Sequence, residues 1–213
     1  MPHARFALDI ETIARVDDPA FDRPSHWETF AVALGYQPEP AVKPEVEVLF
    51  RRDDSVQAEA RLYEDVCQWI KDRHPGDEAT LVTYNGDGYD LPIIRHRVRE
   101  AAHFSREQLA QQLYLIELST EHDDLIQVMR GRTGRWVSLD DALAMHSIEA
   151  EQATWRGEPV TGKDMLEMGQ ALMTDDVPGL RAAVETYAES DVRPLFRLHD
   201  ELVGDRVEHR DQV

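Results

Sequence analysis

Residues 4–12 read ARFALDIET, an apolar run that ends in two acids and from which the rest of the chain can be interpreted. The apolar residues before the acids predict a buried first strand. Side chains two positions apart on a strand point to the same face, so Asp9 and Glu11 are expected side by side. An ordinary solvated strand end would carry the same pair. The pair therefore indicates a site only if other residues of the chain meet it.

The composition bounds the class of protein. The chain has 213 residues, of which 42% are hydrophobic and 31% charged, which is enough for one domain with a sizeable core. No apolar run approaches the length of a membrane span, and the first residues lack the layout of a secretory signal. We therefore expect a cytoplasmic protein without a membrane partner. Cys67 is the only cysteine, and we expect it to be buried and unreactive.

The net charge of −19 comes from 42 acidic and 23 basic residues, and lysine is rare among the basic ones. This balance is typical of proteins from salt-loving microbes, in which a high charge preserves solubility and salt screens the repulsion. Acidity would ordinarily argue against a nucleic-acid partner. A halophilic background removes that argument, so the charge does not exclude a nucleic acid.

The hydrophobic pattern predicts three strands, then helices and strands in alternation, then helices. Three consecutive strands can pair as an antiparallel meander, and later strands reached through a helix add in parallel. We expect one domain over residues 1–204 and a polar tail that frays over 205–213. The predicted strands are 4–12, 27–40, 46–52, 79–86 and 122–129, the last being a strand or a strand-to-helix junction. The predicted helices are 55–74, a segment from 91, 105–113 after a Ser105 cap, 138–148 after a Ser138 cap, and most of 161–203.

Another acid, Asp90, follows the turn residues of YNGDGYD at 84–90. Asn85 and Gly86 both tolerate a positive φ, so the chain can leave a strand tightly there and place Asp90 at the start of a helix. The helix dipole also favours an acid at this position, which explains Asp90 equally well without a functional site.

A tyrosine and an acid stand four residues apart in VETYAESD at 184–191. On a helix, Tyr187 and Asp191 share a face. Val184 and Leu195 lie along the same side, so the face is partly buried, and a buried carboxylate needs a partner. That partner could be an arginine or a metal ion shared with the other acids.

The order of these motifs resembles that of the DEDD superfamily of 3′–5′ exonucleases, the DnaQ-like group, and in particular its tyrosine branch, DEDDy. The motifs are D-x-E at 9–11, N-G-x-x-Y-D-x-P at 85–92 and Y-x-x-x-D at 187–191. The Asp124-Leu step and the SLDDALA segment between the last two motifs resemble the stand-alone exonucleases related to the proofreading domains of family-B DNA polymerases. The resemblance spans residues 5 to about 203.

The resemblance implies an α/β, ribonuclease H-like fold, in which a five-stranded mixed sheet is flanked by helices. It implies hydrolysis from the 3′ end of single-stranded DNA or RNA, with Tyr187 positioning the attacking water. Two divalent ions can activate water and stabilise the leaving oxygen of a phosphodiester. Mg²⁺ and Mn²⁺ prefer oxygen ligands, which carboxylates provide. The implied ligands of the two ions are Asp9, Glu11, Asp90 and Asp191.

Other residues are expected around these motifs. The resemblance implies a contact of Thr12 with the terminal nucleotide, and Tyr84 and Asn85 flank the expected groove as substrate-binding or structural residues. Asp124 is expected in a supporting role. Three arginines that follow Asp90 on its helix are expected on a solvated face; they are Arg95, Arg97 and Arg99.

The stretch 125–139 contains no acid, although acids make up about one residue in five of the chain. Arg130, Arg132 and Arg135 could contact phosphates there, and Trp136 could stack a base. An ordinary surface loop, with arginine in place of lysine, fits the stretch equally well.

The alternatives to an exonuclease are a domain of the same fold that binds nucleic acid without cutting it, a hydrolase of nucleotides or short oligonucleotides, and an acidic scaffold. The choice between DNA and RNA stays open. A proofreading role would require a polymerase as partner, and a repair or processing role is equally compatible. Pro194 departs from the motif pattern, because it removes the helical partner of the Ser190 carbonyl and can tilt Asp191.

Overall fold

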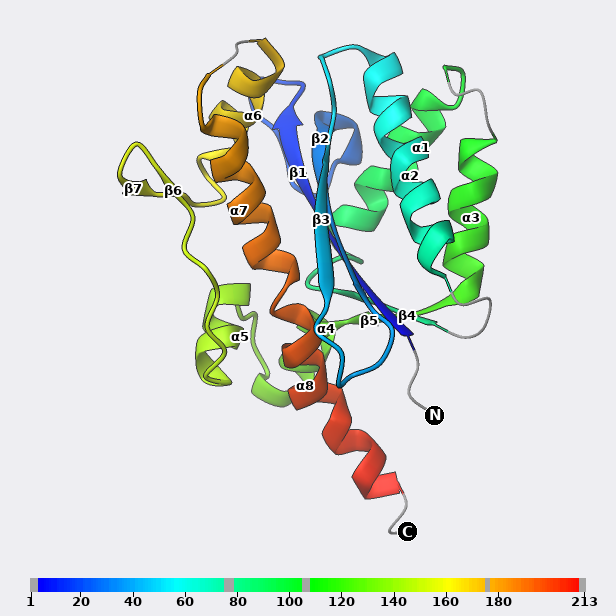
Figure 1. Cartoon of the computed structure of the whole chain (residues 1–213), viewed down its shortest axis with the longest axis vertical. Helices are drawn as coiled ribbons and strands as arrows, with labels where there is room; N and C mark the ends of the chain where they lie inside the picture. The colour runs from blue at the N-terminus through cyan, green and yellow to red at the C-terminus, as the bar shows by residue number, and fades with distance from the viewer. Residues whose placement is uncertain (1–3, 75–78, 105–107, 175–176, 211–213) are drawn as a thin grey trace.

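The computed structural model describes residues 4–74, 79–104, 108–174 and 177–210, with side chains to residue 204. A five-stranded mixed sheet of order β3-β2-β1-β4-β5 runs through its centre, with helices on both faces (Figure 1). β2 pairs antiparallel with β1 and β3, whereas β4 pairs parallel with β1 and β5, which confirms the predicted meander and its parallel additions. The strands are β1 (Ala4–Ala14), β2 (Trp27–Gln37), β3 (Glu45–Phe50), β4 (Ala79–Thr83) and β5 (Thr120–Asp124).

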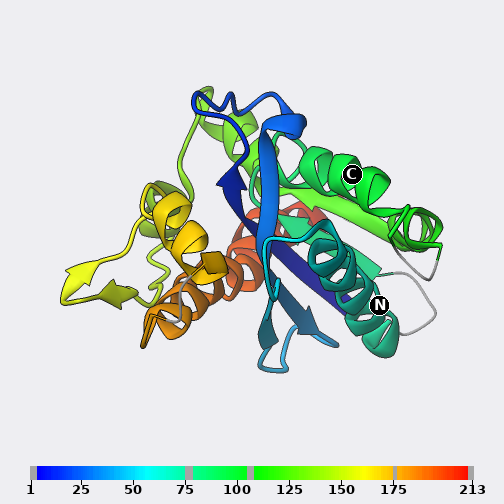
Figure 2. The same cartoon turned by 90° about the horizontal axis from the view of Figure 1, so that it is seen from above.

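The helices form two layers, one on each face of the sheet (Figure 2). α1, α2 and α3 pack on one face, and α4 to α8 pack on the other. A short 3-10 helix, η1 (Pro24–His26), leads into β2, and a small hairpin joins β6 (Thr154–Trp155) to β7 (Glu158–Pro159). The helices are α1 (Val56–Arg73), α2 (Asp90–Ala101), α3 (Leu109–Ser119), α4 (Leu125–Thr133), α5 (Leu139–Met145), α6 (Met165–Thr174), α7 (Leu180–Val192) and α8 (Leu195–Arg210).

The alternation of side chains along β1 decides where its acids point. Phe6 and Leu8 pack into the core beneath α1, α2 and α3. Ala7 and Ile13 pack into the opposite core, beneath α6 and α7. Because side chains alternate between faces, Asp9 and Glu11 share the face of Ala7. The two acids therefore face the layer that contains α7.

Gly169 allows α6 to lie directly against the central strands. A Cβ atom at this position would come within 2.5 Å of the Phe30 ring and 2.6 Å of the Ile13 side chain. Any larger residue would therefore push α6 away from β1. The close approach keeps the start of α6 near the acids of β1.

Pro194 separates α7 from α8. Proline has no amide hydrogen and cannot continue the hydrogen-bonding of the preceding helix. The interruption lies beyond Asp191, which remains in the last turn of α7 with its carboxylate close to those of Asp9 and Glu11. The proline therefore ends the helix without removing Asp191 from the acids of β1.

Several element boundaries differ from the predicted ones. α2 starts at Asp90 itself, and α3 starts at Leu109, while the predicted cap Ser105 lies outside the described residues. α8 continues to Arg210, through part of the segment predicted to fray. The predictions of a Ser55 cap for the helix at 56, a Ser138 cap for α5 and a buried Cys67 are confirmed. None of the described helices has the length and apolar character needed to cross a membrane.

Arg97 is fully buried, so its predicted place on a solvated face is wrong. Its guanidinium donates to both carboxylate oxygens of Glu59 on α1. Glu59 Oε1 also accepts the backbone N–H of Thr29 at 3.0 Å. The prediction failed because a helix pattern does not reveal that a charged residue has a buried partner on another element. Arg95, by contrast, forms a partly exposed pair with Glu117.

Candidate active site

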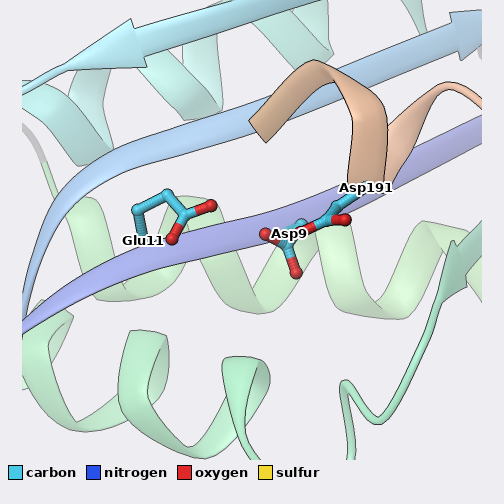
Figure 3. A group of neighbouring side chains, drawn as sticks. All are labelled: Asp9, Glu11 and Asp191. Atoms are coloured by element: carbon cyan, nitrogen blue, oxygen red, sulfur yellow. The ribbon is translucent and has the colours of Figure 1, made fainter. Parts of the chain in front are cut away.

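Three carboxylates converge from two elements that are far apart in the sequence. Asp9 and Glu11 come from β1, and Asp191 comes from the last turn of α7 (Figure 3). One oxygen of each lies within 4.8 Å of one oxygen of each of the others. Glu11 is buried, and Asp9 and Asp191 are partly buried. This convergence was predicted from the motif order and is present in the structure.

The fourth predicted acid, Asp90, lies next to this group. It is the first residue of α2 and is buried. Its Oδ1 atom accepts the backbone N–H of Ile10, between the two acids of β1, at 3.2 Å. It is not one of the three acids within 4.8 Å of one another, but its charge acts on both Asp9 and Glu11. The hydrogen bond thus ties the start of α2 to the centre of β1.

Asn85 and Gly86 allow the turn before Asp90 to form, each for a different reason. Asn85 has a φ of 69°, the left-handed conformation expected of it. Gly86 was also expected to use its tolerance of a positive φ, but its φ is not positive. It is needed because a Cβ atom would lie 2.3 Å from Thr83 Oγ1. The turn is therefore built from one strained φ and one close contact.

Asp124 holds this turn in place. The carboxylate is buried at the end of β5 and accepts the backbone N–H of Asn85 at 2.7 Å and that of Asp87 at 3.1 Å. Because β4 and β5 are parallel neighbours, their ends lie side by side. Asp124 thus positions the segment that delivers Asp90, and the supporting role predicted for it has a structural basis.

Burial and mutual repulsion make these carboxylates hard to ionise in the absence of a cation. Burial, followed by the charges of Asp90, Glu11 and Asp191, raises the pKa of Asp9 well above its ordinary value. Burial, followed by Asp191 and Asp90, raises the pKa of Glu11 in the same way. Burial raises the pKa of Asp90 and of Asp191 to about 7.

These shifts predict how the stability of the metal-free protein depends on pH. Unfolded aspartates have a pKa of about 4, and the folded values of Asp90 and Asp191 are about 7. Between these values the folded state binds more protons, so the free energy of unfolding contributed by these groups falls as the pH rises. We expect Asp191→Asn to unfold near the wild-type temperature at pH 4, but about 3 °C or more above it at pH 8.

Thermal unfolding in EDTA, followed by circular dichroism at both pH values, measures this difference. Asp65→Asn, which changes an exposed acid of α1, is the matched control and should follow the wild type at both. A wild-type protein that is as stable as Asp191→Asn at pH 8 would show that the acids do not repel one another in the folded state.

The Tyr187 hydroxyl lies beside the Asp191 carboxylate, and its interaction with that carboxylate lowers the pKa of Asp191 against the larger effect of burial. Burial and the charges of Asp191, Glu11 and Asp9 raise the pKa of Tyr187 far above its ordinary value. The hydroxyl therefore stays protonated and can donate, but it cannot act as a base. A Cβ atom at Gly162 would lie 3.2 Å from this hydroxyl, so the loop before α6 passes close to it.

The acids lie in an open groove of about 760 Å³. Thr12, Tyr84 and Asn85, which were predicted as substrate contacts, line it. The Tyr84 hydroxyl already donates to the Val137 carbonyl at 2.8 Å, so its ring rather than its hydroxyl is available to a ligand. Tyr89, the tyrosine of the N-G-x-x-Y-D-x-P motif, also lines the groove. So do seven residues that belong to no motif: Phe21, Trp27, Thr161, Gly162, Lys163, Met165 and Leu166.

The predicted arginine contacts do not reach this groove. None of Arg130, Arg132 and Arg135 is among its lining residues, nor is Trp136. Arg132 instead donates to the Leu202 carbonyl at 2.6 Å and links α4 to α8. Contacts of this stretch with a bound strand outside the groove stay a prediction, and part of the stretch is apolar because α4 packs against the core.

The described geometry defines a class of domain: a mixed sheet of order 3-2-1-4-5 whose central strand carries two acids, met by a third acid from a late helix. A family profile described as RNase_H superfamily matches residues 31–203. The chain belongs to the RNase_H superfamily, and its α/β fold is ribonuclease H-like, as predicted. None of the curated proteins compared with the chain matches it.

Solved structures similar to the chain include exonuclease I proteins. A product-bound exonuclease I is 14% identical with a TM-score of 0.48, over 98% of this chain and 46% of that protein. Exonuclease I from Methylocaldum szegediense is 16% identical with a TM-score of 0.45, over 93% and 40%. Exonuclease I of E. coli bound to an oligonucleotide is 15% identical with a TM-score of 0.46, over 97% and 42%. The chain thus spans less than half the length of each.

Proposed function

We propose that the chain is a divalent-metal-dependent 3′–5′ exonuclease of the DEDDy type that acts on single-stranded DNA or RNA, with residues 1–204 as one catalytic domain. The observation that carries the proposal is the convergence of Asp9, Glu11 and Asp191 within 4.8 Å in an open groove. Membership of the RNase_H superfamily supports a nucleic acid as the substrate. The presence of Tyr187 at Asp191 supports the tyrosine branch.

The residues of the groove fit hard divalent cations. Their donors are carboxylate oxygens, which Mg²⁺ and Mn²⁺ prefer. Glu11 Oε1 is buried and has no hydrogen-bond partner among the described residues, which is costly unless an ion binds it. Asp9, Glu11 and Asp191 would hold one ion, and Asp9 with Asp90 would hold a second. Bound there, such ions supply water activation and stabilisation of the leaving oxygen.

The side chains of the groove would position the attacking water and the scissile phosphate. Tyr187 keeps its proton, so its hydroxyl can orient a water molecule through a hydrogen bond. Asp191, beside this hydroxyl, helps to orient it. Lys163 is the only lysine or arginine among the described residues that line the groove, and it is an exposed residue. It can approach the phosphate of a bound strand, whose charge would otherwise be repelled by the four acids.

The substitution Tyr187→Phe tests whether the tyrosine positions the water without taking part in metal binding. We expect cleavage to slow by about 10- to 100-fold, because a hydrogen bond to a charged group contributes about 1.5–3 kcal/mol. The rise in melting temperature on addition of Mn²⁺ should remain, since all four carboxylates are intact. Single-turnover rates and thermal unfolding with and without Mn²⁺ test this. Full activity of Tyr187→Phe would remove the tyrosine from the mechanism.

The experiment that tests the function is a gel assay on 5′-labelled single-stranded DNA and RNA in high KCl with Mn²⁺, beside Asp9→Ala. A ladder that descends from the 3′ end and is absent in the variant is expected. Cleavage of neither strand, together with Mn²⁺-dependent stabilisation, would favour a binding domain that does not cut. Cleavage confined to dinucleotides or other short strands would favour an oligonucleotide hydrolase.

The cellular setting of this activity is part of the same proposal. A cytoplasmic enzyme that trims 3′ ends would work beside a polymerase or a repair protein, as the resemblance to proofreading domains implies. High KCl in the assay reproduces the salt that the net charge of −19 indicates. Activity that falls steadily as KCl is raised to molar concentrations would argue against a halophilic setting.

A further inference from the structure

Phe21 is the most exposed large hydrophobic side chain among the described residues, with 73% of its surface accessible. It is also the only one of these exposed hydrophobic residues that lines the groove. An isolated exposed apolar side chain needs no explanation. An aromatic ring open to solvent at the wall of a groove lined by catalytic acids is more informative, since it offers a flat face to whatever binds there.

Hydrogen bonds hold the backbone next to this ring. The backbone of Ala20, directly before it, is fixed on both sides: its carbonyl accepts from Trp27 Nε1 at 3.0 Å, and its N–H donates to His26 Nδ1 at 3.1 Å. The Arg23 N–H donates to the same carbonyl at 3.1 Å. Three hydrogen bonds at one residue make this loop a rigid support, whereas exposed loops are ordinarily mobile. The ring is thus pre-organised for a partner.

Phe21 is the outer member of an aromatic wall. Its ring stacks on that of Trp27 with centroids 5.4 Å apart and an interplanar angle of 27°. It also meets the ring of Tyr89 at 5.8 Å. Trp27 is buried, and the hydroxyl of Tyr89 is engaged with Thr12 Oγ1 at 2.7 Å, so neither residue is free to move with Phe21. The part of the Phe21 ring that is not covered by Trp27 and Tyr89 faces solvent beside the groove.

The distance of the aromatic wall from the acids determines which part of a bound strand can stack on the wall. Tyr89 directly precedes Asp90 in the chain, so the wall begins beside the carboxylates. A nucleotide whose phosphate lies at the acids has its base within a few ångströms of its sugar, and the base is the flat, apolar part of the molecule. Every nucleobase has a π-face, so an aromatic platform accepts all of them without reading their sequence. A base inside a duplex has both faces covered by its neighbours.

We propose that Phe21 is a specificity-determining residue that stacks on an unpaired nucleobase of the bound strand and selects strands with free bases. This inference rests on the proposed exonuclease function. It assigns to Phe21 the stacking role that the sequence suggested for Trp136, whose side chain is also exposed but does not line the groove.

The kinetic test compares wild type, Phe21→Ala, Phe21→Trp and Trp136→Ala on two single-stranded substrates. One is an oligothymidylate, and the other has tetrahydrofuran abasic residues at its two 3′-terminal positions. We expect Phe21→Ala to raise KM on the intact strand about 10-fold and to leave KM on the abasic strand unchanged. Phe21→Trp should restore the wild-type KM, and Trp136→Ala should not change it. An equal KM for Phe21→Ala and wild type on the intact strand overturns the proposal, as does an equal loss on both strands.

A binding test reports stacking without cleavage. Strands that carry 2-aminopurine at the last or the penultimate 3′ position are titrated with wild type and with Phe21→Ala. Ca²⁺ replaces Mn²⁺, at a concentration at which the gel assay shows no cleavage. Quenching of 2-aminopurine fluorescence by wild type that is lost in Phe21→Ala supports the proposal, and equal quenching contradicts it. This readout remains decisive if neither protein cleaves, so failure of the stacking role and failure of the exonuclease function are separable.

Discussion

Replacing Asp9 by asparagine is expected to reduce 3′-end cleavage on the order of 10³-fold or more, which corresponds to about 4 kcal/mol of transition-state stabilisation. The charges of the three other acids, Asp90, Glu11 and Asp191, all act on Asp9. It is therefore the carboxylate proposed to contact both cations, and an uncharged amide in its place weakens both.

The same substitution should make the metal-free protein more stable, which excludes misfolding as the cause of the lost activity. The amide of Asp9→Asn carries no charge and removes the repulsion that burial and the neighbouring acids impose, so the melting temperature in EDTA at pH 8 should rise. The Mn²⁺-dependent rise in melting temperature should shrink. Asp65→Asn, on the outer face of α1, should match wild type in cleavage and in both unfolding measurements.

Single-turnover cleavage of a labelled strand, with thermal unfolding in EDTA and in Mn²⁺, measures all of these effects. An Asp9→Asn protein that retains more than about a tenth of the wild-type rate would contradict the role of Asp9 as a shared ligand. A protein that loses both activity and stability would leave the site unsupported and indicate that Asp9 has a structural role.

Removing the carboxylate of Glu59 is expected to destabilise the fold by about 3–5 kcal/mol, a loss of about 10 °C in melting temperature for a domain of this size. Glu59 and Arg97 both have side chains with no exposed surface. Glu59→Ala would leave the Arg97 guanidinium buried with only partial compensation from Glu100 and Glu28, and would leave the Thr29 N–H without its acceptor. An uncompensated buried charge is the costly outcome.

Urea unfolding of two further variants isolates the cause. The double variant Glu59→Gln with Arg97→Met removes both charges and keeps an acceptor for Thr29, so it should recover much of the lost stability. Arg95→Met breaks the partly exposed pair with Glu117 on the same face of the molecule and should cost less than about 1 kcal/mol. A Glu59→Ala protein as stable as Arg95→Met would show that the buried pair contributes nothing measurable.

The local pattern of the chain was sufficient for the sheet and for the residue types of the site. Alternation along β1 places Asp9 and Glu11 on one face, and helical spacing places Tyr187 beside Asp191, because both periodicities are properties of the backbone. Parallel addition of β4 and β5 follows from their helical connections. The order of the three motifs then indicated that acids of separate elements meet, and the structure brings three of them within 4.8 Å.

Tertiary contacts alone decided which of the remaining side chains reach the groove. Phe21 and Lys163 line it although they belong to no motif, whereas Arg130 and Trp136, which a charge pattern favoured, do not. The pattern of charges along the sequence does not show whether a side chain points into the groove. That depends on long-range hydrogen bonds, which position the loops and helix ends that carry the side chain. The bonds of Arg132 to Leu202 and of Asp124 to Asn85 are of this kind.

The sequence by itself thus determined the class of fold, the two acids of β1 and the tyrosine–aspartate face of α7, since period and order along the chain are enough for these. Only the tertiary structure decided that Arg97 is buried against Glu59, that Asp124 holds the turn before Asp90 and that Phe21 stands open beside the acids. Each of these depends on a contact between elements far apart in sequence, and no local periodicity encodes such a contact.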